Sequence, residues 1–143
     1  WEENIEVDII LGENSPYIEI MKRKVESSRL NTKILSDVEN MAELMLEADL
    51  AIGAGGTTSW ERCCMGLPSL IVIYADNQLS IVENISAAGA GINIGRSNML
   101  TALKVSQYIE NILESETMMN AMSKECFVIC DGLGADRVVE RLT

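Results

Sequence analysis

Short apolar runs alternate with amphipathic segments along most of the chain, and this alternation is the strongest constraint on its fold. The runs have the length of strands, and the segments between them carry apolar residues at helical spacing. Strands that alternate with helices form a parallel sheet covered by helices. The run at 68–74, "PSLIVIY", is almost continuously apolar, so we expect a central strand that is buried on both faces. The predicted fold class is α/β, a parallel sheet sandwiched by helices.

The boundaries of the expected elements follow from these runs and from capping signals. Strands are expected at 5–12, 32–36, 49–53, 68–74 and 90–95. Helices are expected at 15–28, 37–48, 58–66, 77–89, 99–115, 116–130 and 134–142. Ser15 and Asp37 are expected to cap the first two helices, with Pro16 at the first helical position.

Composition and charge restrict the possible partners. The chain has 143 residues, of which 48% are hydrophobic, so we expect one domain over 1–143 with a mainly aliphatic core. The net charge of -11 argues against nucleic acid as a partner. No run approaches the roughly eighteen apolar residues of a membrane helix, and no signal peptide is recognised. We expect a cytoplasmic protein without a membrane span, and, since the first residue is Trp1, a fragment of a longer chain.

The four cysteines are expected to be reduced thiols in or near the core. Cys63 and Cys64 are adjacent, Cys126 and Cys130 are one helical turn apart, and the chain has no His. This spacing is not that of a zinc site. We therefore expect neither a metal nor a cofactor. A catalytic thiol, with a pKa lowered by the dipole of its helix, is the less favoured alternative for the first pair.

A glycine-rich stretch, "GAGGTTSWE", separates an expected strand from an expected helix. Ligands of open α/β sheets bind outside the carboxyl ends of the strands. Gly53, Gly55 and Gly56 let the backbone approach a ligand closely, and the helix start offers free N–H groups. The pattern predicts an anion site, with phosphate as the favoured ligand. The alternative is a turn that needs its glycines only for tight packing, and the G-K-[ST] of a Walker A loop is absent.

Glu61 allows two interpretations. Thr58 and Glu61 fit a capping box, in which the glutamate reaches back to the backbone at the start of its own helix. The functional alternative is a carboxylate that accepts hydrogen bonds from two sugar hydroxyls. A position in the first helical turn serves both interpretations.

The stretch "ADLAIGAGGTTSWERCCMGLPSLIVIYADNQ" resembles the nucleotide-binding, C-terminal half of the two-domain GT-B sugar-nucleotide enzymes, which has a Rossmann-like sheet. These enzymes include the glycosyltransferase that makes lipid II in peptidoglycan synthesis. The sequence of this stretch is most similar to that of the UDP-sugar hydrolase of pseudaminic acid biosynthesis and to those of the related spore-coat polysaccharide proteins. The similarity is dense over residues 36 to 95 and weak in the C-terminal helices.

The resemblance implies a role for the glycine loop and for the helix that follows it. Four residues would cradle the diphosphate of a UDP-sugar through N–H groups and hydroxyls: Gly55, Gly56, Thr57 and Thr58. Glu61 would accept hydrogen bonds from the 2′- and 3′-hydroxyls of the ribose. Arg62 and Arg96 are the nearest cations, and both are expected to be solvated.

The resemblance also assigns residues after two other strands. Asn77 and Gln78 match the pair that faces the sugar and the reacting centre, although Asn77 has an alternative role as a helix cap. Leu35 and Ser36 would flank the uracil through backbone groups.

Other parts that the resemblance implies are not found in this sequence. Related enzymes begin the domain with a further strand and phosphate loop, and a separate N-terminal domain carries the catalytic histidine. We therefore expect a UDP-binding domain that is inactive alone, from a hydrolase that cleaves a UDP-amino sugar to UDP and free sugar. Its pathway would be nonulosonic (pseudaminic or sialic-type) acid or surface polysaccharide biosynthesis. The alternatives are a UDP-sugar glycosyltransferase domain, or a non-catalytic nucleotide-sugar-binding domain appended to an acylneuraminate cytidylyltransferase.

Overall fold

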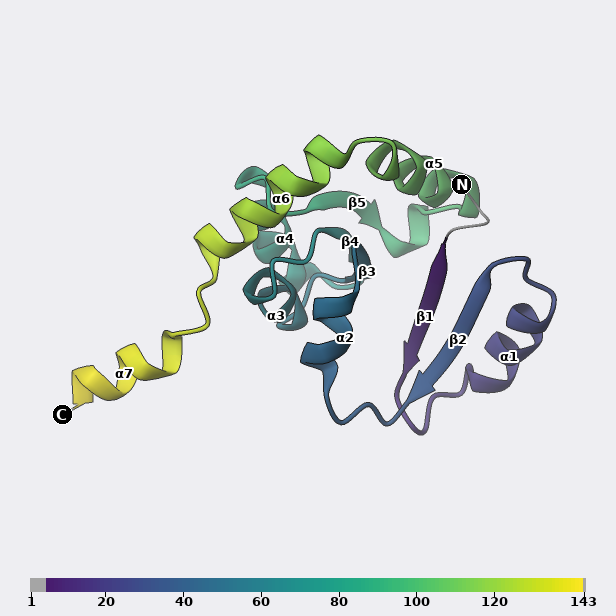
Figure 1. The fold of residues 1–143 in the computed structure, drawn as a ribbon, viewed down its shortest axis with the longest axis horizontal. Helices are drawn as coiled ribbons and strands as arrows, with labels where there is room; N and C mark the ends of the chain where they lie inside the picture. Colours follow the sequence, from purple (N-terminus) through teal and green to yellow (C-terminus); the bar gives the residue numbers. More distant parts are fainter. Residues whose placement is uncertain (1–4, 143) are drawn as a thin grey trace. The chain divides into compact units, whose positions relative to one another are not determined.

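A computed structural model of the chain describes residues 5–142. The chain divides into two compact units, Trp1–Met41 and Ala42–Thr143 (Figure 1). Hydrogen bonds define a two-stranded sheet in the first unit and a three-stranded sheet in the second, and all strand pairs in both are parallel. The α/β class that the sequence predicts is confirmed.

The first unit is a strand–helix–strand motif. Strands β1 (Glu6–Leu11) and β2 (Asn31–Ser36) pair from Glu6 with Asn31 to Leu11 with Ser36, and α1 (Ile18–Glu26) connects them. The expected capping of this helix by Ser15 is wrong. The N–H of Ser15 donates to the carbonyl of Gly12 at 2.9 Å, so a turn forms first and the helix begins only at Ile18.

The predicted cap at Asp37 is also wrong. Helix α2 (Met41–Glu47) begins later along the chain. Asp37 has a φ of 55°, in the left-handed region, whereas a residue that caps a helix N-terminus has extended backbone. Aspartate is one of the few residues that adopt this conformation readily, and here it ends β2 by turning the chain.

The sheet of the second unit has the order β3 (Ala51–Ala54), β4 (Ser69–Ile73), β5 (Ile92–Arg96). All five residues of β4 are buried, as its apolar sequence predicts. The pairing of β4 with β5 shifts register between Ile71 and Val72. Val72 pairs with Ala54 of β3 and with Gly95 of β5, so the carboxyl ends of both neighbours lie beside the same part of β4.

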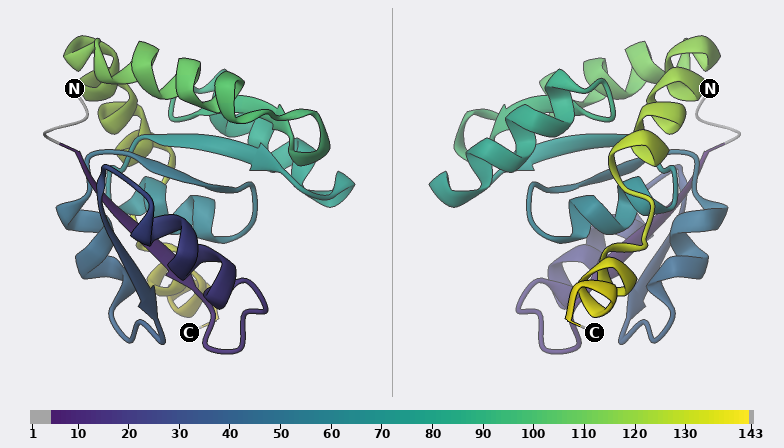
Figure 2. Two further views of the ribbon diagram at one scale, coloured as in Figure 1. Left: turned by 90° about the vertical axis from the view of Figure 1, so that its right-hand side faces the viewer. Right: turned by 90° about the vertical axis from the view of Figure 1, so that its left-hand side faces the viewer.

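Helices cover both faces of this sheet. The helices that follow β3 are α3 (Thr58–Cys64), α4 (Leu79–Ala87), α5 (Ala102–Leu113), α6 (Glu116–Ile129) and α7 (Gly134–Leu142). Short 3₁₀ turns form at Asp76–Gln78 and Ser97–Met99. Ile71 and Ile73 of β4 pack with residues of α3 and α4, whereas Leu70 and Val72 pack with residues of α5 and α6. Successive strand residues point to opposite faces, so β4 contributes to both layers of the core (Figure 2).

Within residues 5–142, no helix combines the length and the apolar character needed to cross a membrane.

Candidate functional site

The glycine loop lies at the carboxyl end of β3. Beyond the end of this strand, the N–H of Gly55 still donates to the carbonyl of Val72 in β4 at 3.0 Å. The next bonds, from Ser59 N–H to Gly56 and from Trp60 N–H to Thr57, begin the turn of α3, both at 3.0 Å. Residues 55–58 thus connect strand and helix at the sheet edge where the sequence predicts a ligand.

Packing explains two of the three glycines. A Cβ at Gly53 would collide with the guanidinium of Arg62. A Cβ at Gly55 would collide with the side chain of Val82 and lie 3.3 Å from that of Ile71. At these two positions the tight-packing interpretation holds.

Gly56 has no such explanation in the described part of the chain. A Cβ there would meet no atom within 4 Å, and Gly56 does not have a positive φ. Among residues 5–142, no acceptor is found for the N–H groups of Gly56, Thr57 and Thr58, and both threonine side chains are exposed. This part of the loop is an open surface with three available donors.

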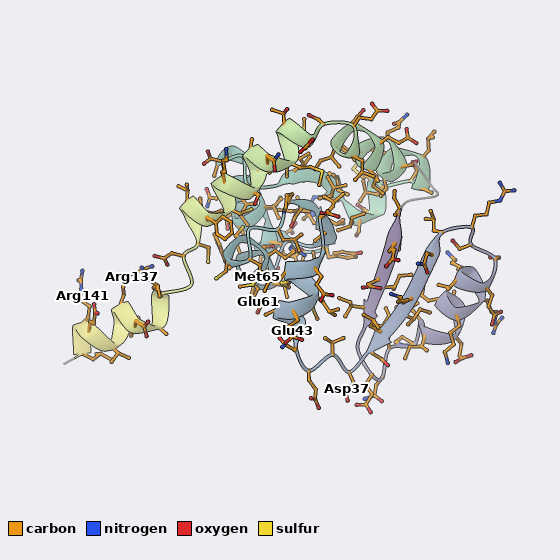
Figure 3. The ribbon with its side chains drawn as sticks, viewed as in Figure 1. Asp37, Glu43, Glu61, Met65, Arg137 and Arg141 are labelled. Carbon is orange, nitrogen blue, oxygen red and sulfur yellow. The ribbon has the colours of Figure 1, made fainter. Side chains whose placement is uncertain are left out.

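Helix α3 places Glu61 in solvent, beside the loop. Thr57 occupies the N-cap position, and its side chain makes no capping hydrogen bond. The capping box would need Thr58 at that position with Glu61 three residues on, but Glu61 is instead the fourth helical residue. The side chain of Glu61, labelled in Figure 3, is exposed, and none of the ion pairs within residues 5–142 includes its carboxylate. The capping-box interpretation is wrong, and the carboxylate is available to a ligand.

The buried face of α3 carries Ser59, Arg62 and Cys63. The expectation that Arg62 is solvated is wrong, since it is only 6% exposed. A guanidinium nitrogen, Nη2, donates to the carbonyl of Ala54 and to Oγ of Ser59, each at 2.9 Å. Burial lowers the pKa of Arg62, but arginine stays protonated in proteins. Arg62 lies three residues after Ser59, so both lie on the same face of the helix. This spacing is the feature of the sequence that could have indicated the burial of Arg62.

The segment after β4 lies next to the glycine loop. The Cβ of Gln78 is 3.6 Å from the Cβ position at Gly55, and its Oε1 accepts a hydrogen bond from the N–H of Tyr74 at 2.9 Å. Asn77 is exposed and is not the cap of α4, since Gln78 occupies that position. The capping alternative for Asn77 is therefore wrong, because the 3₁₀ turn displaces the helix start.

Arg96 forms an ion pair with Asp76. Its Nη2 lies 2.7 Å from Oδ1 of Asp76. The pair joins the end of β5 to the turn that holds Asn77. Both side chains are substantially exposed, so the pair contributes at most about 1 kcal/mol to stability.

Leu35 and Ser36 lie at the carboxyl end of β2, in the first unit, where they pair with Ile10 and Leu11. Leu35 is half-buried and Ser36 is exposed. Their expected position beside the uracil stays a prediction.

The cysteines belong to the packing between α3 and α6. Cys63 and Cys126 are buried, Cys64 and Cys130 are half-buried, and all four are free thiols. Contact with Cys63, together with burial, raises the pKa of Cys126. Among the described residues, no three His, Cys, Asp or Glu side chains are grouped to hold a metal ion. The buried positions favour a role in the core over that of a catalytic thiol.

A parallel α/β unit with an open glycine loop at the carboxyl edge is typical of nucleotide-binding domains. The chain belongs to the glycosyltransferase family 28 C-terminal domain family, which it matches over residues 1–137. This places it in a glycosyltransferase-like class, as a domain consistent with the C-terminal, Rossmann-like half of the GT-B fold.

The chain is also similar in sequence to three proteins. The chain is 27% identical to the spore coat polysaccharide biosynthesis protein SpsG of Bacillus subtilis over 129 residues, which are 90% of the chain and 38% of that protein. It is 24% identical to a UDP-N-acetylglucosamine–N-acetylmuramyl-(pentapeptide) pyrophosphoryl-undecaprenol N-acetylglucosamine transferase of Leuconostoc citreum, over 74% of the chain and 30% of that protein. An uncharacterized protein of Methanocaldococcus jannaschii is 32% identical over 51% of the chain and 15% of its own length. The chain thus spans well under half the length of each.

We expect Gly55→Ala to lower the stability of the fold and Gly56→Ala to leave it almost unchanged. The methyl group at residue 55 meets Val82, and overpacking of this kind costs about 1–3 kcal/mol. At residue 56 the methyl group projects into open space, so the change in the free energy of unfolding should stay within about 0.5 kcal/mol. Urea unfolding of both variants measures this difference. A Gly56→Ala variant as unstable as Gly55→Ala would contradict the packing described here.

Proposed function

We propose that this chain binds the UDP part of a UDP-sugar, with the diphosphate on the loop at 55–58. The observation that carries the proposal is the open segment at Gly56, where no atom of the described chain accounts for the glycine. Its N–H groups, with those of Thr57 and Thr58, are suited to phosphate oxygens, since backbone donors bind anions in such loops. The N–H of Gly55 is already used by Val72, so Gly55 contributes through packing.

The proposed ribose ligand is Glu61. Its carboxylate is exposed and lies three residues after Thr58, which places both on one face of α3. A carboxylate can accept one hydrogen bond on each oxygen, which suits two neighbouring hydroxyls.

The proposed sugar-facing residues are Asn77 and Gln78. The Oε1 atom of Gln78 is occupied by Tyr74, so this side chain offers its amide N–H groups to a ligand. Asn77 is exposed and offers both a donor and an acceptor. Neither amide can take a proton at neutral pH, so these residues orient a sugar or an attacking group rather than act as a base.

The uracil is proposed to lie at Leu35 and Ser36, against backbone groups at the end of β2. This contact would make UDP a better ligand than ADP or CMP. The chain spans 38% of SpsG and 30% of the transferase, so the rest of such an enzyme is proposed to close over the sugar from a second, N-terminal domain.

The proposed reaction breaks the bond between the anomeric carbon of the sugar and the diphosphate, with UDP as the leaving group. Transfer to an acceptor hydroxyl fits the family and the similarity to the Leuconostoc citreum transferase. Transfer to water, which releases a free amino sugar for pseudaminic or sialic-type acids, is the second candidate. The similarity to SpsG over 90% of the chain favours a role in surface polysaccharide biosynthesis for either. The free thiols are compatible with a cytoplasmic location.

Removal of the Glu61 carboxylate tests the ribose assignment. We expect Glu61→Ala to weaken UDP binding by about 1.5–3 kcal/mol, the contribution of hydrogen bonds to a charged group. The same variant should bind 2′-deoxy-UDP nearly as well as it binds UDP, whereas the unchanged chain should prefer UDP. Calorimetric titration of both ligands measures this. Since Glu61 caps nothing in the structure, a variant that loses stability but keeps its preference for UDP would refute the assignment.

The 143-residue chain alone should not turn over UDP-sugars. Positioning of both reactants supplies about 7–11 kcal/mol of barrier lowering, and this chain is proposed to hold only the nucleotide side. It also has no histidine to serve as a base. We expect no UDP release from UDP-N-acetylglucosamine in a coupled assay, with or without an acceptor. Turnover by the chain alone would contradict this expectation and would make Asp76 and the Cys63–Cys64 pair candidate catalytic groups.

A further inference from the structure

Arg62 is the one charged side chain that is buried within residues 5–142. None of the ion pairs of this described part includes it, and its Nε has no hydrogen-bond partner there. A buried charge is costly unless it is paired. A neutral donor could make the same two hydrogen bonds, to a carbonyl and to a hydroxyl, without the free-energy cost of burying a charge. The presence of an arginine at this position therefore requires another explanation.

The guanidinium joins the two ends of the glycine loop. It donates to the carbonyl of Ala54, which is the last residue of β3, and to Oγ of Ser59 in α3, each at 2.9 Å. The hydroxyl of Ser59 also lies 3.3 Å from the carbonyl of Ala54. Gly53 leaves room for the guanidinium, since a Cβ there would occupy its place. Three residues of the glycine stretch and its helix thus enclose one cation.

The position of this charge matters because other sources of positive potential are weak here. Helix α3 has only 7 residues, and the chain carries a net charge of -11. A buried charge is screened by salt much less than an exposed one. The neighbouring Glu61 carboxylate favours the charge of Arg62 without forming an ion pair with it, and an anion on the loop would add to this favourable interaction.

We propose that Arg62 is a positioning residue for the diphosphate. It holds the ends of the loop at 55–58 together and provides, from the protein side of the loop, a fixed positive charge that favours an anion on the N–H groups of Gly56, Thr57 and Thr58. It does this without contacting the ligand. This inference rests on the proposed function, because it presupposes a phosphate-bearing ligand on the loop.

The ratio of the affinities for UDP and uridine tests the role of the charge. In Arg62→Met, UDP affinity should fall at least about tenfold, which corresponds to about 1.4 kcal/mol, while uridine affinity stays unchanged. Arg62→Lys keeps the charge and should retain most of the preference for UDP. The matched control is Lys104→Met, which removes an exposed charge from α5 and should leave the ratio as it is. Equal losses for UDP and uridine in Arg62→Met would reduce Arg62 to a structural clamp and overturn the inference.

A second measurement needs no variant and remains decisive if Arg62→Met does not fold. The Nε–H of Arg62, which has no partner in the described chain, should change its NMR shift when UDP is added and not when uridine is added. If UDP shifts the signals of the loop amides but not that of the Arg62 Nε–H, the inference is also overturned. If the unchanged chain shows no preference for UDP over uridine, the proposed function itself fails, and the two failures are thereby distinguished.

Discussion

The burial of β4 on both faces is the constraint on which the candidate site depends. Each residue of Ser69–Ile73 is buried, and alternate residues pack against different helix layers. Since the strand is fixed from both sides, so are the segments that pair with it or follow it. The N–H of Gly55 is held by Val72, and Gln78 lies beside Gly55. The packing of one strand therefore brings together two loops that are separated by a helix and a strand.

The charge distribution around the loop differs from that of the chain as a whole. The chain is strongly acidic, yet the groups beneath and within the loop are donors: one buried guanidinium and three backbone N–H groups without acceptors in the described residues. Glu61 on the exposed face is the acceptor that we propose for the ribose hydroxyls. Donors and an acceptor thus lie on the same short helix and loop, which is the division that a nucleoside diphosphate requires.

The sequence predicted the strands, the central place of β4 and the position of the glycine loop, because apolar periodicity follows directly from burial. It also predicted the first residues of α3, α6 and α7 correctly. It did not predict the capping residues: Ser15, Asp37 and Thr58 all match capping patterns, but none of them is an N-cap in the structure. It also missed the burial of Arg62, because charged residues are rarely buried and only the packing of α3 shows which face is inside. The first-unit residues Leu35 and Ser36 remain predictions, as their role depends on the ligand itself.

The most direct test of the central claim is an NMR titration of the ¹⁵N-labelled chain with UDP, with ADP and CMP for comparison. The account predicts that UDP shifts the backbone amides of residues 53–61 and 76–79 more strongly than the other nucleotides do. It also predicts that Gly56→Ala, which leaves the fold intact, abolishes these shifts. A response that leaves the amides of residues 53–61 and 76–79 unshifted, equal responses to all three nucleotides, or a Gly56→Ala variant that responds like the unchanged chain would contradict it.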